Sequence, residues 1–226
     1  MHDDGLDGLV WTKIDFMGGV MIRRFFLGAI ILLLAGTAFA QKADALDLYR
    51  KGRYAEAVAV CEQEIKVNPN NIDSYCVLCW SLIRNRQYAQ AEQYALEARK
   101  KNATDIRLIE SVGEARYYQG KNNGALEMFQ LYVTNAPMSA GDYSWAYYYM
   151  GEIYVRQAKY EHADIAYSMA VHVNPSKALF WTRCGYAREM TSSYQSALDA
   201  YNKALELDAA QVEAVRGKER CASRLR

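Results

Sequence analysis

The chain of 226 residues repeats itself with a period of 34 residues. Tyr54 and Tyr88 are one period apart, and so are Tyr160 and Tyr194; each tyrosine is followed three residues later by an alanine. A fifth copy lies between these pairs and carries Asn122 in the tyrosine position. A fixed period of this length indicates one supersecondary unit stacked on copies of itself. The repeat therefore directs the search for function toward a binding surface rather than toward catalysis.

Each unit has the pattern of two helices. Apolar residues after Tyr194 recur with a period near 3.6, which is typical of an amphipathic helix. Small residues stand nine positions before the tyrosine position, where two helices can approach closely: Ala45, Cys79, Gly113, Gly151 and Gly185. Pro69 and Pro175 each follow an asparagine and end a second helix, because proline lacks the amide donor. On this pattern, Gly151→Leu should destabilise the chain more than Glu152→Ala.

These residues resemble the tetratricopeptide repeat. The strings GRYAEAVAVCEQEIKVNPN and SSYQSALDAYNKALELD are similar to the second helix of that family's unit. The resemblance covers residues 41–211 and implies an all-α, right-handed superhelical solenoid of about five helix-turn-helix repeats. The repeats are expected at 41–71, 72–105, 106–139, 144–177 and 178–211, with an insertion at 140–143 and a C-terminal capping helix at 212–226.

The N-terminal region carries a targeting pattern. Residues 21–40 read MIRRFFLGAIILLLAGTAFA, in which two arginines precede an apolar run that ends in a small-residue site. This is typical of a cleaved signal peptide, and the run is short for a transmembrane span. We therefore expect cleavage after Ala40, a mature chain that begins at Gln41, and export to the bacterial periplasm. The alternative is an uncleaved segment that anchors the chain to the membrane.

The first twenty residues precede that signal. Residues 1–20 are polar and include four aspartates, which do not belong in front of a signal peptide. We interpret them as a non-native upstream extension, with Met21 or Met17 as the initiator.

Composition narrows the classes of function. The net charge is +1, so the chain lacks the basic footprint of a nucleic-acid-binding protein. The five cysteines are odd in number and several occupy packing positions; whether any of them forms a disulfide stays open. Cys76 and Cys79 form a bare CxxC without the context of a redox or zinc site, and His162 and His172 are expected to face solvent. No nucleophile and base stand at a meaningful spacing, so we expect no enzyme activity, no metal and no cofactor.

The resemblance also implies where a partner would bind. In such repeats the first helix of each pair builds the concave wall, and its groove positions are rich here in tyrosine, tryptophan and arginine, the residue types that dominate binding hot spots. Consecutive aromatic residues in WAYYY at 145–149 cannot all face one side of a helix. The groove positions are Tyr49, Trp80, Arg84, Arg107, Glu110, Glu114, Tyr117, Tyr118, Trp145, Tyr148, Tyr149, Glu152, Arg156, Arg183 and Tyr186, together with Cys76, Ile83 and Thr182.

Two hypotheses for function follow. The first is an exported, non-catalytic scaffold that holds a peptide or loop of an envelope protein in this groove. A clamp for a C-terminal carboxylate is not supported, because Leu46 and Trp80 stand where such a clamp needs asparagines. The second hypothesis is a structural subunit whose repeats assemble into an oligomer or envelope complex without a separate ligand. The mass of the particle in solution separates the two.

Overall fold

The computed structural model describes residues 44–226, which form one compact unit of eleven helices without a strand. The predicted upstream extension, signal peptide and cleavage site fall in residues 1–43 and lie outside the described part of the chain. None of the helices in the described part is both long enough and apolar enough to cross a membrane.

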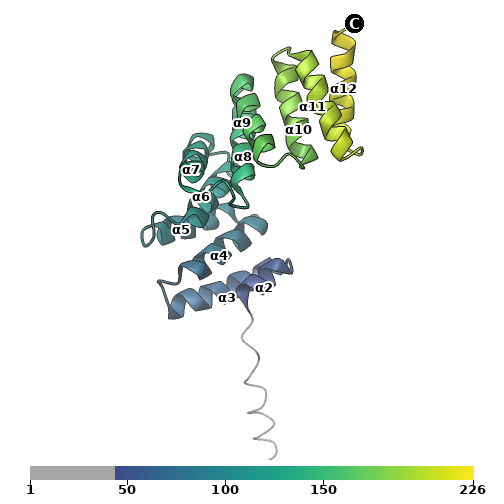
Figure 1. The fold of residues 1–226 in the computed structure, drawn as a ribbon. Coiled ribbons are helices and arrows are strands. Elements are labelled where there is room, and N and C mark those ends of the chain that lie inside the picture. Colours follow the sequence, from purple (N-terminus) through teal and green to yellow (C-terminus); the bar gives the residue numbers. More distant parts are fainter. Residues whose placement is uncertain (1–43) are drawn as a thin grey trace, which may run out of the picture. The chain divides into compact units, whose positions relative to one another are not determined.

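The helices form five antiparallel pairs and a final single helix, which follow one another in chain order (Figure 1). The fold class predicted from the sequence, an all-α solenoid of about five helix pairs with a capping helix, is confirmed. The helices are α2 (Ala45–Arg50), α3 (Tyr54–Val67), α4 (Ile72–Arg84), α5 (Tyr88–Arg99), α6 (Ile106–Tyr118), α7 (Asn122–Asn135), α8 (Tyr143–Arg156), α9 (Tyr160–Val173), α10 (Ala178–Met190), α11 (Tyr194–Leu207) and α12 (Val212–Arg224).

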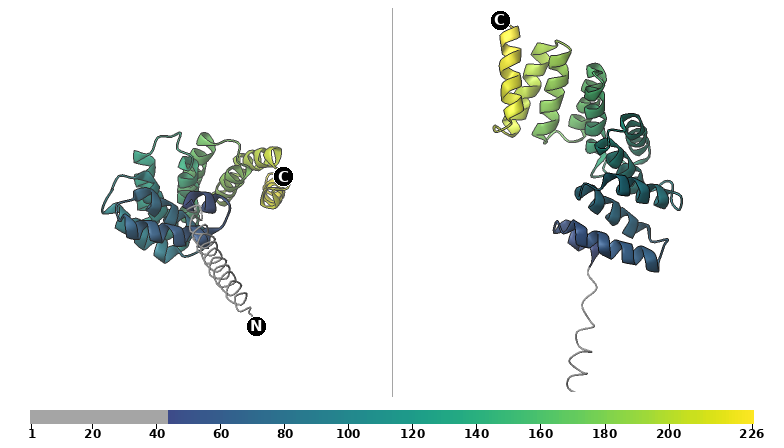
Figure 2. Two further views of the ribbon diagram at one scale, coloured as in Figure 1. Left: turned by 90° about the horizontal axis from the view of Figure 1, so that it is seen from below. Right: turned by 180° about the vertical axis from the view of Figure 1, so that it is seen from behind.

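The first helices of consecutive pairs lie side by side along most of the solenoid and build a wall. Each helix packs against its neighbours in sequence, and α2 also contacts α4, α4 contacts α6, α6 contacts α8, and α10 contacts α12. The second helices of different pairs show no comparable contact in residues 44–226. The two views in Figure 2 show the stacking of successive pairs from below and from behind. Side chains on the first helices therefore share one face of the solenoid.

Close contact between the helices of a pair depends on glycine. In the third, fourth and fifth pairs a glycine of the first helix lies against the aromatic ring sixteen residues later. A Cβ atom on Gly151 would lie 2.5 Å from Cε1 of Tyr167, and one on Gly185 would lie 2.8 Å from the Tyr201 ring. Both tyrosines are fully buried. No side chain fits between these helix backbones.

The turns inside the pairs share one backbone conformation. The residue two positions before each second helix has a positive φ angle, in the left-handed region that favours glycine. Gly52 and Gly120 meet this requirement with a glycine. Arg86, Ala158 and Ser192 adopt the same conformation with φ of 61°, 55° and 62°. The three side chains therefore carry a conformational cost that the glycines avoid.

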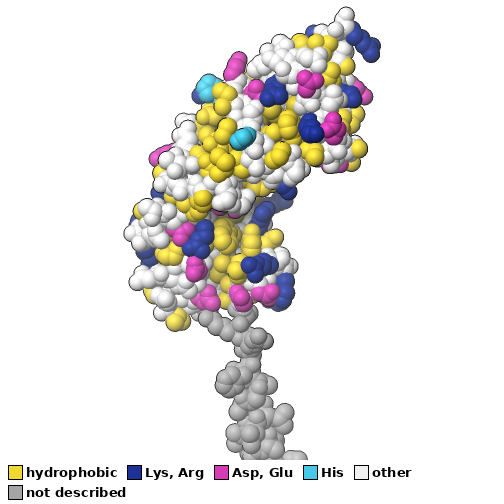
Figure 3. Space-filling model, viewed as in Figure 1, with side chains coloured by type: hydrophobic (Ala, Val, Ile, Leu, Met, Phe, Trp, Pro, Cys, Tyr) yellow, Lys and Arg dark blue, Asp and Glu magenta, His cyan; other side chains and the backbone are white. Residues whose placement is uncertain are grey.

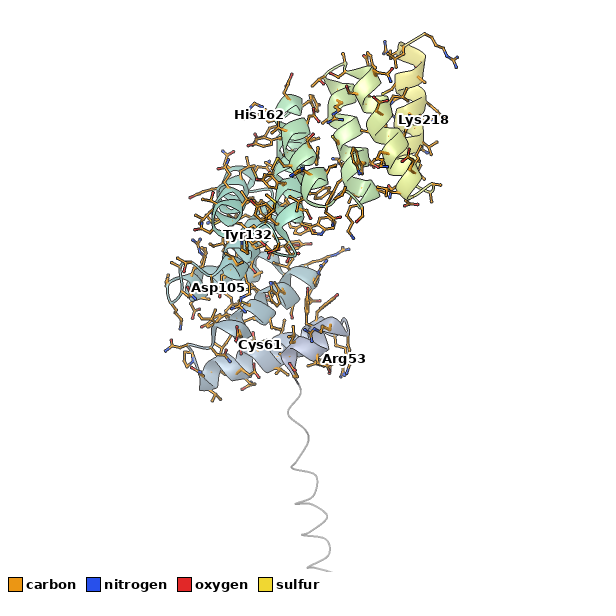
Figure 4. All side chains as sticks on the ribbon, viewed as in Figure 1. Arg53, Cys61, Asp105, Tyr132, His162 and Lys218 are labelled. Carbon is orange, nitrogen blue, oxygen red and sulfur yellow. The ribbon has the colours of Figure 1, made fainter. Side chains whose placement is uncertain are left out.

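The cysteines serve as packing residues. All five are free and buried, so none forms a disulfide within the described residues. Burial raises the pKa of the Cys61 and Cys76 thiols to about 12, which keeps both protonated and unreactive. Cys61, labelled in Figure 4, belongs to the core between α3 and its neighbours. Cys76 was expected in the groove, and that expectation is wrong because the side chain packs with Leu108 in the core.

The glycine contacts lead to a stability prediction. Gly151→Ala should lower the free energy of unfolding by about 1–3 kcal/mol, because the new methyl group must displace the Tyr167 ring. Gly141→Ala is the matched control: a Cβ there meets no atom within 4 Å, so the change should stay within about 0.5 kcal/mol. Urea unfolding followed by circular dichroism measures both. Equal midpoints would contradict the close-contact interpretation.

The turn conformation leads to a second prediction. The same change, alanine to glycine, should stabilise the chain at one position and destabilise it at another. Ala158→Gly should raise the free energy of unfolding by about 0.5–1 kcal/mol, since it relieves a left-handed alanine. Ala59→Gly, at an exposed position inside α3, should lower it by about 0.5–1 kcal/mol. Both variants can be compared by urea unfolding under the same conditions. A destabilised Ala158→Gly would show that φ at this turn is not a source of strain.

Candidate peptide-binding groove

A cavity of about 340 Å³ opens on the wall of first helices. Its volume falls within the range of roughly 300–1,000 Å³ that is common for ligand pockets. Residues from α2, α4, α6 and α8 line it, together with the residue just before α8. They are Tyr49, Trp80, Ile83, Arg84, Glu110, Glu114, Asp142, Trp145 and Tyr149. The cavity thus joins the first four repeats in a single site.

Aromatic rings form part of its lining. The rings of Tyr49 and Trp80 have centroids 6.0 Å apart, and those of Trp145 and Tyr149 are 6.4 Å apart. All four side chains are partly exposed. The two rings of each pair pack against each other at a tilt, and both still present surface to the cavity.

Carboxylates form another part of the lining. Glu110 and Glu114 lie one turn apart on α6, and Asp142 caps the start of α8. The Tyr149 hydroxyl donates a hydrogen bond of 3.1 Å to Glu114. Glu110 makes neither a hydrogen bond nor an ion pair with any of residues 44–226. No group of histidine, cysteine or acidic side chains in this part of the chain is arranged to hold a metal ion.

Burial and like charge raise the pKa values of these carboxyl groups. Burial raises the pKa of Glu110 well above its usual value, and the charges of Asp142 and Glu114 raise it further. Burial likewise raises the pKa values of Glu114 and Asp142. Arg84 opposes all three shifts, although it makes no direct ion pair with these carboxylates. The neighbouring Tyr49 side chain raises the pKa of Arg84.

The cavity gathers seven of the fifteen predicted groove residues, and also Ile83. The seven are Tyr49, Trp80, Arg84, Glu110, Glu114, Trp145 and Tyr149. Asp142 is the one lining residue that the sequence analysis missed. It lies in the four-residue insertion that breaks the 34-residue period, and that insertion was the available signal.

Most of the other charged groove residues bond to the neighbouring repeat. Arg107 makes ion pairs of 2.8 Å with Asp73 and 2.7 Å with Asp105. Arg183 pairs with Glu152 at 2.5 Å, and the Tyr167 hydroxyl donates to the same carboxylate at 2.5 Å. Glu152 is therefore a structural residue, and Glu152→Ala would remove this partner from both Arg183 and Tyr167.

Arg156 and Tyr117 form a similar link. The Arg156 guanidinium lies 3.9 Å from the centre of the Tyr117 ring and donates a hydrogen bond of 3.0 Å to the Tyr117 carbonyl oxygen. Tyr117 is buried, so its ring is covered by the arginine instead of facing a partner. Tyr118, next in sequence, is exposed and stacks on Tyr88 with ring centroids 4.8 Å apart.

The aromatic run of α8 has a packing role that the sequence did not reveal. Neighbouring first helices contact each other along most of the wall, but α8 and α10 do not do so to the same extent. Phe180 of α10 fills the space between them, with its ring 5.0 Å from Trp145 and 5.6 Å from Tyr148. Tyr148 therefore packs between repeats, whereas Trp145 both packs and lines the cavity.

Other hollows lie beside this cavity, and one of about 440 Å³ has Trp80 and Arg107 in its lining. Arg183, Tyr186 and Thr182 line one of about 330 Å³ beside α12, together with Arg216 and Arg220. A smaller apolar hollow of about 120 Å³ lies beside His162. Figure 3 shows apolar side chains around the two histidines in this region, and Figure 4 labels His162 on α9. His162 and His172 are both exposed, as predicted.

Stacked helix pairs with a lined cavity on the first-helix face define a helical-repeat scaffold. The tetratricopeptide repeat family model matches residues 42–106 and 148–212, more than half of the chain. The chain belongs to the tetratricopeptide repeat family, whose proteins act in general as scaffolds for protein–protein interaction.

Similar proteins agree on the fold. Anaphase-promoting complex subunit 3 of Schizosaccharomyces pombe is 26% identical over 155 residues, which cover 66% of this chain and 22% of that subunit. PilF of Pseudomonas aeruginosa superimposes with a TM-score of 0.71 at 13% identity, over 80% of this chain and 81% of PilF. YrrB, a repeat protein with an unusual peptide-binding site, gives a TM-score of 0.63 at 15% identity, over 77% and 88% of the two chains.

The unpaired carboxyl of Glu110 leads to a prediction on stability. The native state holds a proton on Glu110 at pH values where the unfolded chain has lost it, so stability should fall as pH rises above the usual glutamate pKa. Glu110→Gln removes this titration. Its gain in free energy of unfolding should be absent near about pH 4 and should grow toward about pH 8. Urea unfolding across that range measures the gain; Glu127→Gln, at an exposed position on α7, is the control. A pH-independent difference would contradict the assigned burial.

Proposed function

We propose that this chain is an exported, non-catalytic scaffold that binds a segment of another envelope protein in the groove formed by its first helices. One observation carries the proposal: seven groove residues from four successive repeats line a single cavity. A site built from several repeats suits an extended or helical segment that crosses them. Its mixture of rings and ionisable groups resembles the composition of binding hot spots.

The similar proteins support a binding role. YrrB, which shares the fold, has a peptide-binding site, and the curated relative is a subunit of a protein complex. The chain spans about a fifth of the length of that relative, with 22% of the subunit covered, so the activity of the whole complex is not transferred. The common element is a stack of helix pairs that presents one face to other chains.

Export is part of the proposal and has its own test. The positive residues, apolar run and small-residue site within 21–40 support secretion to a periplasm. The intact mass of the protein recovered from the envelope fraction should correspond to residues 41–226. A mass that retains residues 21–40 would replace export by membrane anchoring.

The alternative is assembly of copies of this chain without a separate ligand. The last helix gives it one supporting observation. Val212, the first residue of α12, is 59% exposed, and Leu225, just after its last residue, is 47% exposed. The open end of the stack therefore presents apolar surface. A second stack could continue the solenoid there.

Site-specific photo-crosslinking distinguishes the two functions. A photoreactive phenylalanine analogue at Trp80 in the cavity, expressed in the native cell, should give an adduct with one other protein. The same analogue at Gln130, exposed on α7, is the control and should give none. The analogue at Val215, on the exposed part of α12, reports on assembly of copies.

The outcomes separate cleanly. A heterologous adduct from position 80 alone supports the groove as the binding surface. Equal labelling from positions 80 and 130 would show that the groove has no special role. Adducts of twice the chain mass from position 215, with none from position 80, would favour the structural subunit.

A further inference from the structure

We propose that the cavity selects a basic residue of its partner, so that a lysine or arginine side chain of the bound segment enters it and meets Glu110. This inference rests on the proposed binding function and specifies its chemistry. The cavity lies where four repeats join, so a side chain inserted there would fix the register of a segment lying along the wall.

The balance of charge in the cavity favours a cation. Glu110, Glu114 and Asp142 line it against the single guanidinium of Arg84. The other acidic residues of the groove are already paired: Glu152 with Arg183, and Glu189 with Arg220. Glu110 is the exception, because it has no hydrogen-bond or ion-pair partner among residues 44–226. Glu110 is half-buried and lines the open cavity, so a charged donor from outside can pair with its carboxyl.

The aromatic lining suits the rest of such a side chain. Trp80 and Trp145 contribute indole rings, the best partners for cation–π contact. Ile83 and the rings provide apolar surface for the methylene stem of a lysine or arginine, which packs along apolar surface with its charged head free. The cavity volume of about 340 Å³ accommodates a single long side chain without rearrangement of the helices.

Other occupants fit less well. A carboxylate would approach Glu114 and Asp142, and Arg84 alone would offset their repulsion. An apolar side chain would leave Glu110 without a partner in a drier site, which increases the cost of burial. A metal ion lacks a suitable group of ligands in the described part of the chain.

Binding of a cation should be linked to release of a proton. The titratable and charged groups that face Glu110 are Arg84 and the Cys76 thiol from α4, Glu114 on α6, Asp142 before α8, and Tyr132 from α7. Burial and the two acidic neighbours keep Glu110 protonated in the empty cavity. An ammonium or guanidinium group lowers the pKa of that carboxyl, so the proton leaves as the cation enters. Affinity should therefore rise as the pH increases above the usual glutamate pKa, because less proton must then be displaced from Glu110 when the cation enters.

The test uses the full chain and a random peptide library displayed on phage. The unchanged protein should enrich peptides that share a lysine or arginine at one position. Glu110→Gln should lose that preference, whereas Glu127→Gln, an exposed glutamate on α7, should keep it. One enriched peptide is then synthesised with its basic residue and with norleucine in that place. Replacing the basic residue, or Glu110 by glutamine, should each weaken binding by roughly tenfold or more, and the two losses should not add.

The pH dependence of affinity distinguishes loss of the Glu110 charge from a simple loss of packing, because a loss of packing would weaken binding equally at every pH. Affinity of the unchanged protein for the basic peptide should rise with pH, and the slope should be reduced in Glu110→Gln. Enriched peptides without a common basic position would overturn the inference while leaving the binding function intact. A library that yields no enriched peptide would overturn the binding function and the inference with it. Additive losses from the two replacements would show that the basic residue contacts another part of the groove.

Discussion

The contact between a bare helix backbone and an aromatic ring sets the geometry on which the rest of the structure depends. Gly113 lies against Phe129, and Gly151 lies against Tyr167. A ring on the second helix requires the absence of a side chain on the first, because the backbones could not otherwise come this close. The earlier pairs use smaller partners on both sides, such as Cys79 and Ala95, which pack in one core cluster. This contact fixes the angle and distance of each pair, and repetition of the pair aligns the first helices into a wall.

The sequence predicted the parts of the structure that repeat. A period of 34 residues, small residues at a fixed place and a helical apolar pattern are local signals, so they define the helix pairs and the fold class without knowledge of the stack. Seven residues that line the cavity were also predicted from the sequence, because the groove positions repeat with the same period. The prediction weakened wherever a contact joins different repeats. Arg107 lies beside Asp73, one period away, only once the stack has formed.

The same reasoning explains the residues whose roles were missed. Tyr117 occupies a groove position, but Arg156 of the next pair covers its ring. Asp142 does not belong to the repeat at all, and it joins the cavity because the insertion places it at the start of α8. Departures from a period are thus informative in their own right. They mark places where the chain adds a side chain that the repeating pattern cannot supply.

Bonds between repeats determine which groove residues are available to a partner. Arg107, Arg183 and Arg220 form ion pairs with acidic side chains along the wall. These ion pairs link neighbouring repeats and leave those acidic side chains unavailable to a partner. Trp145 also contributes to this framework through Phe180, so its loss would disturb packing as well as recognition. Glu110 differs from all of these, since its carboxyl has no hydrogen-bond or ion-pair partner among residues 44–226, and replacing it with glutamine preserves its shape. Because the Glu110 carboxyl lines the cavity and holds no neighbouring repeat in place, a ligand can bind to it without breaking a contact of the stack.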